Sequence, residues 1–216
     1  MRRRWIVAVG VAVVLVAIGA LGLGRYQARQ TVAEAEHIAA VLQVGAGSRV
    51  ADVGAGRGAY TVELAHRIMP DGYVYATEIN PENLAAIRLA VAEAGLDNVT
   101  TIESRAADTG LPPGCCDGIV LRTVYHHLTD PAPFVTDLFT AARPGARLAI
   151  IDFPPSGLLS LIAGVDDVPE NRGGHGVPPD VVIDELTAAG FTLEERIEDW
   201  GGGNYCLVFR RSATAP

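Results

Sequence analysis

From residue 49 onward, short apolar runs alternate with longer stretches of helical periodicity, and this alternation constrains the fold of the 216-residue chain more than any other feature. Strands are predicted at five apolar runs, Arg49–Val53, Tyr73–Thr77, Val99–Ile102, Gly118–Leu121 and Leu148–Ile151. Helices are predicted between most of them, at Tyr60–Ile68, Pro81–Ala94 and Pro133–Ala142. Strands that alternate with helices form a parallel sheet covered on both faces, so we expect a doubly wound α/β fold.

The C-terminal part of the chain follows a different pattern. A helix is predicted at Asp180–Ala189, followed by strands at Phe191–Ile197 and Tyr205–Phe209 with a turn through Gly201–Gly203 between them. Two consecutive strands without an intervening helix pair antiparallel, so we expect a hairpin that closes one edge of the sheet. The stretch Pro154–Pro179 is rich in glycine and proline, and irregular stretches of this length often form lids or binding loops.

The N-terminal segment carries an uncharged run of twenty residues, Trp5–Gly24. A helix of that length spans about 30 Å, the thickness of the hydrocarbon core of a bilayer. We therefore predict a membrane anchor in residues 1–29 and a folded domain in residues 30–216, beginning with a helix at Thr31–Gln43. The alternative is a cleaved signal segment, with Ala33-Glu34-Ala35 as the cleavage site. The run is long for a signal and the site lies far beyond it, so an uncleaved anchor is favoured.

Charge is distributed unevenly between this segment and the rest of the chain. All 17 basic residues are arginine, and Arg2, Arg3, Arg4, Arg25 and Arg29 lie in the first 29 residues with no acid among them. The arginine bias narrowly favours a cytoplasmic N-terminus, which would place the domain on the periplasmic side of a bacterial inner membrane. The rest of the chain has 12 arginines against 25 acids, a balance of 12 − 25 = −13, which excludes nucleic acid as an expected partner. The absence of lysine excludes Schiff-base and P-loop chemistry.

A strand, a glycine turn and a helix follow one another in Asp52-Val53-Gly54-Ala55-Gly56-Arg57-Gly58. Glycines allow a ligand to approach the backbone, and the helix start offers unpaired N–H groups, so this turn predicts a nucleotide or carboxylate site. Glu78 ends the second strand, where a carboxylate can accept ribose hydroxyls, and Asp108 follows the third strand, where it could bind an adenine amino group. The turn by itself fits either a dinucleotide such as NAD or another adenosyl ligand.

Several motifs together give a more specific resemblance. They are Asp52-x-Gly54-x-Gly56-x-Gly58, Glu78, Leu111-Pro112 before Asp117-Gly118-Ile119-Val120, Tyr125-His126-His127-Leu128 and Arg143-Pro144-Gly145. In these motifs the chain resembles class I S-adenosylmethionine-dependent methyltransferases, over roughly Val32 to Phe209. Within that family it is similar to small bacterial enzymes distantly related to ubiquinone/menaquinone and arsenite methyltransferases.

The resemblance implies a Rossmann-like sheet, mostly parallel with an antiparallel C-terminal hairpin, and S-adenosylmethionine as cofactor. It implies a glycine turn that holds the methionine end of the cofactor, Asp52 at its amino group, Glu78 at the ribose and Asp108 at the adenine. The spacing from Asp108 to Leu111 is shorter than usual in the family, so Ala107 could take the adenine position instead. The full set of expected cofactor-binding residues is Asp52, Val53, Gly54, Ala55, Gly56, Glu78, Ile79, Asp108 and Arg122.

The candidate catalytic residues are Tyr125, His126 and His127, which follow the fourth strand at the edge where doubly wound sheets bind ligands. A histidine there could accept a proton from the methyl acceptor, although histidines in such a run are more often structural, packing beneath the cofactor or bonding to the backbone. His175, in the long loop, could enter the site. Arg122 could bind the carboxylate of the cofactor or pair with an acid of the protein.

The cysteines predict no metal site. Cys115 and Cys116 are adjacent and Cys206 is distant, a spacing that fits neither a disulfide framework nor a zinc site. A soft metalloid on the adjacent pair is conceivable, but small buried side chains are the favoured interpretation.

The resulting hypothesis is a membrane-anchored methyltransferase that acts on a small or lipid-like acceptor. One alternative is a non-catalytic binding or scaffold domain of the same fold. The other is an NAD-linked oxidoreductase, with Tyr125 or His126 as proton donor, which would have a further parallel strand in place of the terminal hairpin.

Overall fold

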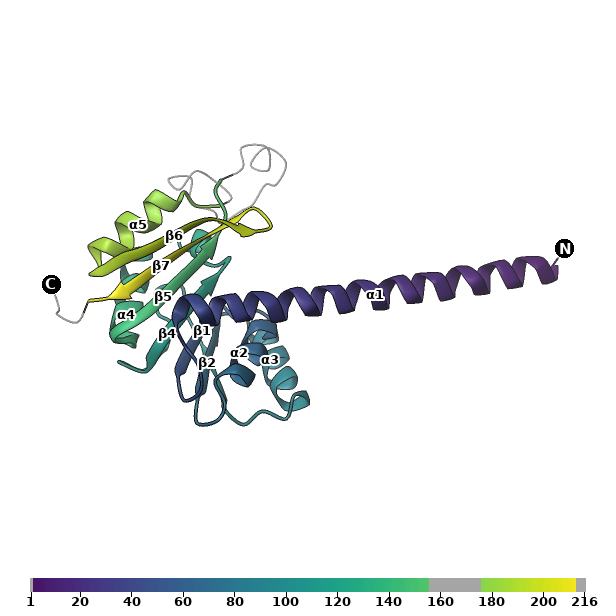
Figure 1. Cartoon of the computed structure of the whole chain (residues 1–216), viewed down its shortest axis with the longest axis horizontal. Coiled ribbons are helices and arrows are strands. Elements are labelled where there is room, and N and C mark those ends of the chain that lie inside the picture. Colours follow the sequence, from purple (N-terminus) through teal and green to yellow (C-terminus); the bar gives the residue numbers. More distant parts are fainter. Residues whose placement is uncertain (1, 156–175, 213–216) are drawn as a thin grey trace.

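The computed structural model describes residues 2–155 and 176–212, with side chains from residue 22 onward. It shows a mixed sheet covered by helices, from which one long helix, α1, extends away (Figure 1). The predicted loop Pro154–Pro179 falls largely, and His175 entirely, outside the described residues.

The sheet has seven strands in the order β3-β2-β1-β4-β5-β7-β6. Strands β1 to β5 are parallel, while β7 runs antiparallel to both β5 and β6. This arrangement confirms the predicted doubly wound sheet with a C-terminal hairpin at one edge, and the parallel strand required by the oxidoreductase alternative is replaced by β7. The strands are β1 (Arg49–Val53), β2 (Tyr73–Glu78), β3 (Val99–Glu103), β4 (Cys116–Arg122), β5 (Ala142–Asp152), β6 (Phe191–Gly201) and β7 (Asn204–Arg211).

Helices cover both faces of the sheet, and each face has its own buried core. On one face, Ile38 and Leu42 of α1 and Leu64 of α2 pack against β-strand residues such as Val120. On the other face, Leu138 of α4 and Leu186 of α5 pack against a second set of strand side chains. The helices are α1 (Arg2–Leu42), α2 (Ala59–Arg67), α3 (Pro81–Glu93), α4 (Pro131–Ala141) and α5 (Pro179–Ala188), with a 3-10 turn η1 (Tyr125–His127).

Local sequence fixes where these helices begin. Asn80 precedes α3, and its side-chain oxygen accepts hydrogen bonds from the backbone N–H groups of Glu82 and Asn83. Proline occupies the first helical position of α3, α4 and α5, where its missing N–H and fixed φ are compatible with a helix start. Helices α3, α4 and α5 therefore start within two residues of the predicted positions, since these signals are local.

The topology creates a binding edge between β1 and β4. From β1 the chain proceeds outward through β2 and β3, and then returns to the other side of β1 as β4. In open α/β sheets, ligands bind at the carboxyl ends of the strands where the order reverses in this way. Val53, Glu78 and Arg122, at the ends of β1, β2 and β4, lie at this edge.

The first helix differs from the prediction. We expected an anchor followed by a separate helix at Thr31–Gln43, whereas α1 runs without interruption from Arg2 to Leu42. Among the residues whose side chains the structure describes, no helix is long and apolar enough to span a membrane. The uncharged run Trp5–Gly24 lies almost entirely before those residues, so the anchor remains a prediction.

The fifth strand also begins earlier than predicted. The register of β4 and β5 jumps from Cys116 opposite Ala142 to Gly118 opposite Arg147, so the Arg-Pro-Gly turn bulges out within β5 instead of preceding it. Gly145 has a φ of 82°, a left-handed conformation that favours glycine at this bend.

Candidate functional site

The glycine turn after β1 adopts left-handed backbone conformations, with φ of 71° at Gly54 and 55° at Gly56. A side chain at Gly54 would collide with Val124, since a Cβ there would lie 2.4 Å from its Cγ2 atom. A Cβ at Gly56 would meet no atom within 4 Å. The turn therefore packs against Val124, after β4, at Gly54 and has open space beside Gly56.

Glu78 fixes this turn from the neighbouring strand. One carboxylate oxygen accepts a hydrogen bond from the N–H of Gly56 at 2.8 Å, and the other accepts from Ile79 at 2.9 Å and Asn80 at 3.0 Å. The residue is only 7% exposed. An ionised carboxylate offers about four acceptor positions, so about one remains for a ligand. The structure thus leaves Glu78 an acceptor position for a ligand while the backbone bonds persist.

A cavity of about 360 Å³ lies between the ends of β2 and β4 and is called here the β2–β4 cavity. It opens beside the glycine turn, and its wall combines backbone, small polar groups and apolar side chains. The lining residues are Val53, Gly54, Glu78, Ile79, Ser104, Arg105, Ala106, Thr123, Val124, His127, Leu128, Thr129 and Phe134. Four of the predicted cofactor-binding residues, Val53, Gly54, Glu78 and Ile79, are therefore brought together at one cavity.

Asp52 lies behind the turn instead of on the cavity wall. It is 4% exposed, and one of its carboxylate oxygens accepts a 2.6 Å hydrogen bond from the hydroxyl of Thr61. Burial raises the pKa of Asp52 to about 6, with the nearby charge of Glu78 adding to the shift and the Thr61 bond opposing it. Ala55, also predicted at the site, packs instead against the small core beneath α3.

Asp108 lies outside the wall of the cavity. Its carboxylate accepts a 2.7 Å hydrogen bond from the N–H of Gly110 and lies 3.9 Å from the guanidinium of Arg105. The lining residues supplied by the segment after β3 are Ser104, Arg105 and Ala106. This carboxylate therefore stabilises its own turn, and Ala107 is likewise absent from the lining.

The three predicted catalytic residues, all in η1, have different surroundings. His127 lines the β2–β4 cavity. Tyr125 is fully buried, and its hydroxyl donates a 2.7 Å hydrogen bond to Glu185 of α5. His126 is 2% exposed, and its Nδ1 lies 2.8 Å from a carboxylate oxygen of Asp152.

Asp152, at the end of β5, holds η1 through both the backbone and the ring of His126. Its second carboxylate oxygen accepts a hydrogen bond from the N–H of His126 at 3.1 Å. The ring of His126 in turn contacts that of His127, with 3.9 Å between ring centroids. Among the three candidates, His127 is thus the one at the cavity, and Asp152 is a supporting residue that sequence reasoning assigned no role.

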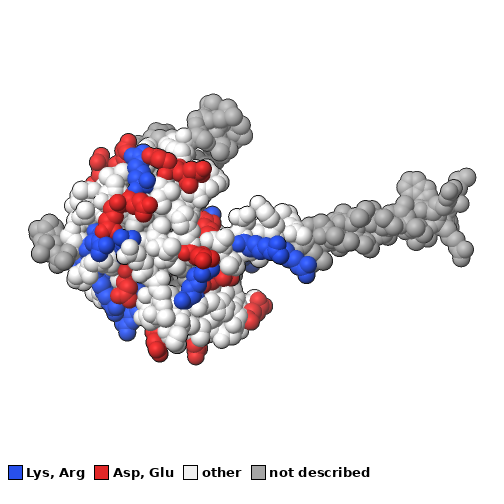
Figure 2. All heavy atoms as spheres, in the orientation of Figure 1, with Lys and Arg blue, Asp and Glu red and all other residues white. Residues whose placement is uncertain are grey.

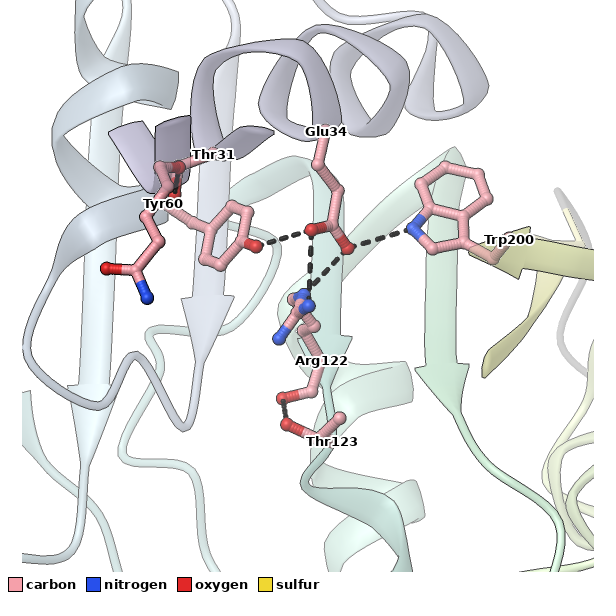
Figure 3. A network of polar contacts seen from close by, with 7 residues as sticks. Thr31, Glu34, Tyr60, Arg122, Thr123 and Trp200 are labelled. Atoms are coloured by element: carbon pink, nitrogen blue, oxygen red, sulfur yellow. Dashed lines mark hydrogen bonds and ion pairs between the residues drawn. The ribbon is translucent and has the colours of Figure 1, made fainter. Parts of the chain in front are cut away.

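Arg122 pairs with an acid of the protein, Glu34 of α1 (Figure 3). Its Nε and Nη2 atoms donate to the two carboxylate oxygens of Glu34 at 2.7 and 3.2 Å. Glu34 also accepts hydrogen bonds from the hydroxyl of Tyr60 at 2.5 Å and the indole N–H of Trp200 at 3.0 Å. We call Glu34, Tyr60, Arg122 and Trp200 the Glu34 cluster. Of the two partners expected for Arg122, the structure therefore contains the protein carboxylate.

The two charges of the Glu34 cluster, on Glu34 and Arg122, are paired with each other. Burial acts to raise the pKa of Glu34, but the hydrogen bonds from Arg122 and Tyr60 outweigh it, so this pKa lies below its usual value. The guanidinium of Arg122 also lies 4.8 Å from the centroid of the Tyr60 ring, within cation–π range. No local sequence motif marks Glu34, Tyr60 or Trp200 as members of a site. The one indication in the sequence was Arg122, a charged residue after an apolar strand, which required an acidic partner.

A second cavity, also of about 360 Å³, lies between α1 and the turn of the β6–β7 hairpin and is called here the α1–hairpin cavity. Arg122 forms part of its wall, and His37 stacks on Trp200 with 3.9 Å between ring centroids and 11° between planes. The lining residues are Gln30, Ala33, Glu34, His37, Arg122, Trp200, Gly201, Gly202 and Asn204.

Surface charge is mixed over the body of the protein. Figure 2 shows acidic and basic side chains interspersed on the visible face, with basic side chains where α1 leaves the body. Arg25 and Arg29 of α1 are both exposed. This face carries no extended basic patch of the kind that binds nucleic acid.

The three cysteines are buried. Cys115 and Cys116 are joined by a disulfide between adjacent residues, which the sequence analysis did not expect, and Cys206 is free. In the described part of the chain, no three His, Cys, Asp or Glu side chains are grouped as metal ligands.

Several known proteins similar to this chain are named as methyltransferases. Residues 51–150 match the family model described as a methyltransferase domain. The chain is 29% identical over 122 residues to a ubiquinone/menaquinone biosynthesis C-methyltransferase of Marinomonas sp., covering 55% of this chain and 49% of that protein. It is 26% identical over 166 residues to a ubiquinone biosynthesis O-methyltransferase of Aeromonas salmonicida, covering 74% and 67%.

A solved structure of similar fold is also a methyltransferase. A crystal structure of an S-adenosylmethionine-dependent methyltransferase from Aquifex aeolicus superposes with a TM-score of 0.69 at 25% identity, covering 82% of this chain and 89% of that one. The chain spans about half the length of the first curated relatives it matches, 49% and 47%.

Proposed function

Because the chain is similar to class I S-adenosylmethionine-dependent methyltransferases, we propose that it belongs to this family and transfers the methyl group of this cofactor to a small-molecule acceptor. One observation carries the proposal. A cavity at the switch point of the sheet is bordered by a left-handed glycine turn and by a buried carboxylate, Glu78, on the adjacent strand end.

The residues of the β2–β4 cavity fit an adenosyl cofactor. The open space beside Gly56 leaves room for a ligand against the backbone, and Glu78 retains an acceptor position for a ribose hydroxyl. The side chain of Ile79 is 58% exposed at the cavity and offers an apolar surface to a planar base. Ser104, Arg105 and Ala106 would border the base, a role that the sequence analysis gave to Asp108. Asp52 would attract the amino group from behind the turn.

The bound cofactor supplies an electrophilic methyl group, so the protein has mainly to orient the acceptor and to exclude water. His127 lines the β2–β4 cavity and is the residue we assign to accept a proton from an acceptor hydroxyl. Asp152 and His126 would act as positioning residues, because they fix η1 and the ring that His127 contacts.

The acceptor we propose is lipid-like. Two relatives are named for quinone biosynthesis, one as a C-methyltransferase and one as an O-methyltransferase. The uncharged N-terminal run of this chain supports the same class, since an enzyme tethered to a bilayer meets membrane-dissolved acceptors at a high local concentration.

We also propose that residues 1–29 anchor the protein in a membrane without cleavage. The continuity of α1 supports the anchor. If Trp5–Gly24 spans the bilayer, the ten helical residues from Gly24 to Glu34 place the Glu34 cluster only about 15 Å from the bilayer. Cleavage after Ala35 would remove Glu34 with its four hydrogen bonds and would cut at a fully buried alanine.

Calorimetric titration of the full chain in detergent with S-adenosylmethionine tests the function. Binding with micromolar affinity and transfer of labelled methyl groups to extractable lipid are expected. No heat of binding at millimolar cofactor would overturn the proposal and favour the scaffold alternative.

A reporter fused to the C-terminus tests the topology. The arginine bias supports a periplasmic domain, whereas the cofactor is made in the cytoplasm. A periplasmic reporter would therefore contradict ordinary methyl transfer, and a cytoplasmic reporter would show that the arginine bias misleads here.

A further inference from the structure

The α1–hairpin cavity has no part in holding the cofactor. It equals the β2–β4 cavity in volume, at about 360 Å³, and lies on the other side of the end of β4. Arg122 lines one cavity and the next residue, Thr123, lines the other. A transfer between two molecules needs two sites that adjoin, and these cavities flank the same strand end.

The wall of this cavity is polar without carrying a net charge. The carboxylate of Glu34 and the guanidinium of Arg122 neutralise each other at 2.7 Å, and the other two bonds of Glu34 come from neutral donors. The carboxamides of Gln30 and Asn204 form no side-chain hydrogen bond with any described residue. They can donate to or accept from an uncharged oxygen-bearing ligand, whereas a charged ligand would find no counter-charge.

One side of the cavity is flat and aromatic. His37 and Trp200 are stacked nearly parallel, at 11°, and His37 is exposed on its outer side. Such a surface favours a planar ring that can stack on it. Gly201 and Gly202 of the hairpin turn also line the cavity, and a Cβ added at Gly201 would meet no atom within 4 Å, so the backbone there is open to a ligand.

A stripe of side chains on one face of α1 leads away from this cavity. Leu23, Tyr26, Gln30, Ala33 and His37 follow one another at steps of three and four residues, which places them on one helix face. The two members outside the cavity, Leu23 and Tyr26, are large hydrophobic side chains exposed at 59% and 60%. The face therefore connects the cavity to the uncharged N-terminal run over about 20 Å.

From these features we infer that the α1–hairpin cavity binds the methyl acceptor, and that this acceptor is an uncharged planar ring with hydroxyl or carbonyl oxygens and an apolar chain. The ring stacks on the His37–Trp200 pair, and the chain lies along Leu23 and Tyr26. A ring oxygen must then reach past Thr123, at the end of β4, to meet the methyl group and His127 in the β2–β4 cavity. The inference rests on the proposed methyl transfer and adds the place and the chemical class of the acceptor.

Filling the cavity tests the site of the ring. Ala33→Trp places an indole in the α1–hairpin cavity, while Ala40→Trp adds the same group at another exposed alanine of α1 that does not line it. The full chain in detergent is titrated anaerobically with 1,4-dihydroxynaphthalene, and separately with S-adenosylhomocysteine. Ala33→Trp is expected to weaken binding of the ring by at least about tenfold. Ala40→Trp should leave it within about twofold.

The tail is tested with the same ring carrying two isoprene units. Leu23→Asp and Leu89→Asp replace two leucines of nearly equal exposure, 59% and 60%, of which only Leu23 lies on the stripe. The chain should strengthen binding to the unaltered protein several-fold. Leu23→Asp should remove that gain, leaving binding of the bare ring unchanged, and Leu89→Asp should preserve it.

The outcomes separate this inference from the proposed function. Loss of ring binding in Ala33→Trp with S-adenosylhomocysteine affinity unchanged supports the site. Equal ring binding in Ala33→Trp and Ala40→Trp, or no ring binding by the unaltered protein that nevertheless binds S-adenosylhomocysteine, overturns the inference and leaves the methyltransferase proposal standing. Failure to bind S-adenosylhomocysteine overturns the proposed function itself.

Discussion

The replacement Glu34→Gln tests whether α1 is an integral part of the folded domain. Glu34 accepts four hydrogen bonds, two of them from the Arg122 guanidinium, and its side chain is 20% exposed. A glutamine keeps the shape but has only one acceptor oxygen, and its amide nitrogen would face donors. Hydrogen bonds to charged groups contribute about 1.5–3 kcal/mol each when buried, and this cluster is only partly buried. We therefore expect a loss of about 2–4 kcal/mol in the free energy of unfolding.

The loss is measured by thermal and urea denaturation of the full chain in detergent, followed by circular dichroism. For a domain of this size, about 2–4 kcal/mol corresponds to a decrease in Tm of about 4–16 °C. Glu36→Gln is the matched control on the same helix, because Glu36 is 71% exposed and its nearest arginine nitrogen, in Arg67, lies 3.6 Å away. That change should cost no more than about 0.5 kcal/mol. Equal losses in the two variants would refute the reasoning.

Three further predictions concern the turn and its supports. Asp52→Asn should stabilise the fold at pH 7.5 by up to about 3 kcal/mol, because burial raises the pKa of this acid from 3.8 to about 6 and penalises its ionised form. The gain should shrink as pH falls from 6 to 4, where the native Asp52 is also neutral; a gain independent of pH in urea denaturation would contradict this. Glu78→Gln should weaken S-adenosylhomocysteine binding by about tenfold in calorimetry, since the amide nitrogen of glutamine cannot accept the backbone hydrogen bonds that the carboxylate accepts. The control Glu103→Gln, at the exposed end of β3, should bind normally. Gly58→Ala should lower the free energy of unfolding by about 1–3 kcal/mol, because φ is 86° and the new Cβ would lie 3.2 Å from the backbone of α3. Gly47→Ala, with φ of 82° and open surroundings, should cost less, and equal costs would exclude the α3 contact as the cause.

The strands and helices could be predicted because their signals are local. Apolar runs, proline at helix starts and glycine turns located all five parallel strands along the chain and the hairpin at one edge of the sheet. The exceptions have physical reasons. Residues 25–30 contain two arginines, which suggested a break between anchor and domain, yet all of them are compatible with a helix and α1 continues through them. The Arg-Pro-Gly motif precedes the strand predicted at Leu148–Ile151, whereas in the structure strand pairing is found on both sides of it.

The candidate site could be predicted only where it is formed by consecutive residues. The glycine turn and Glu78 follow from a strand, its turn and the next strand end, and they share a cavity wall. Asp108 and Tyr125 have the expected positions in the sequence, but their side chains bond to Gly110 and Glu185. Side-chain direction depends on such tertiary partners, which no local pattern specifies.

The Glu34 cluster was not predictable, since its members come from α1, α2, β4 and β6. The two most distant, Glu34 and Trp200, are 166 residues apart. A charged residue at the end of a buried strand demands a counter-charge, yet any of the 25 acids could have supplied it.

That separation has a consequence for the synthesis of the protein on the ribosome. At about 5–20 residues per second, Trp200 emerges some 8 to 33 s after Glu34, with 166 residues synthesised in between. During this interval the first helix lacks the last of its binding partners and, if residues 1–29 anchor the protein as proposed, could be inserted into a membrane. Delivery of the leading segment to a bilayer would thus precede completion of the globular body, and the ribosome would set the order of these two events.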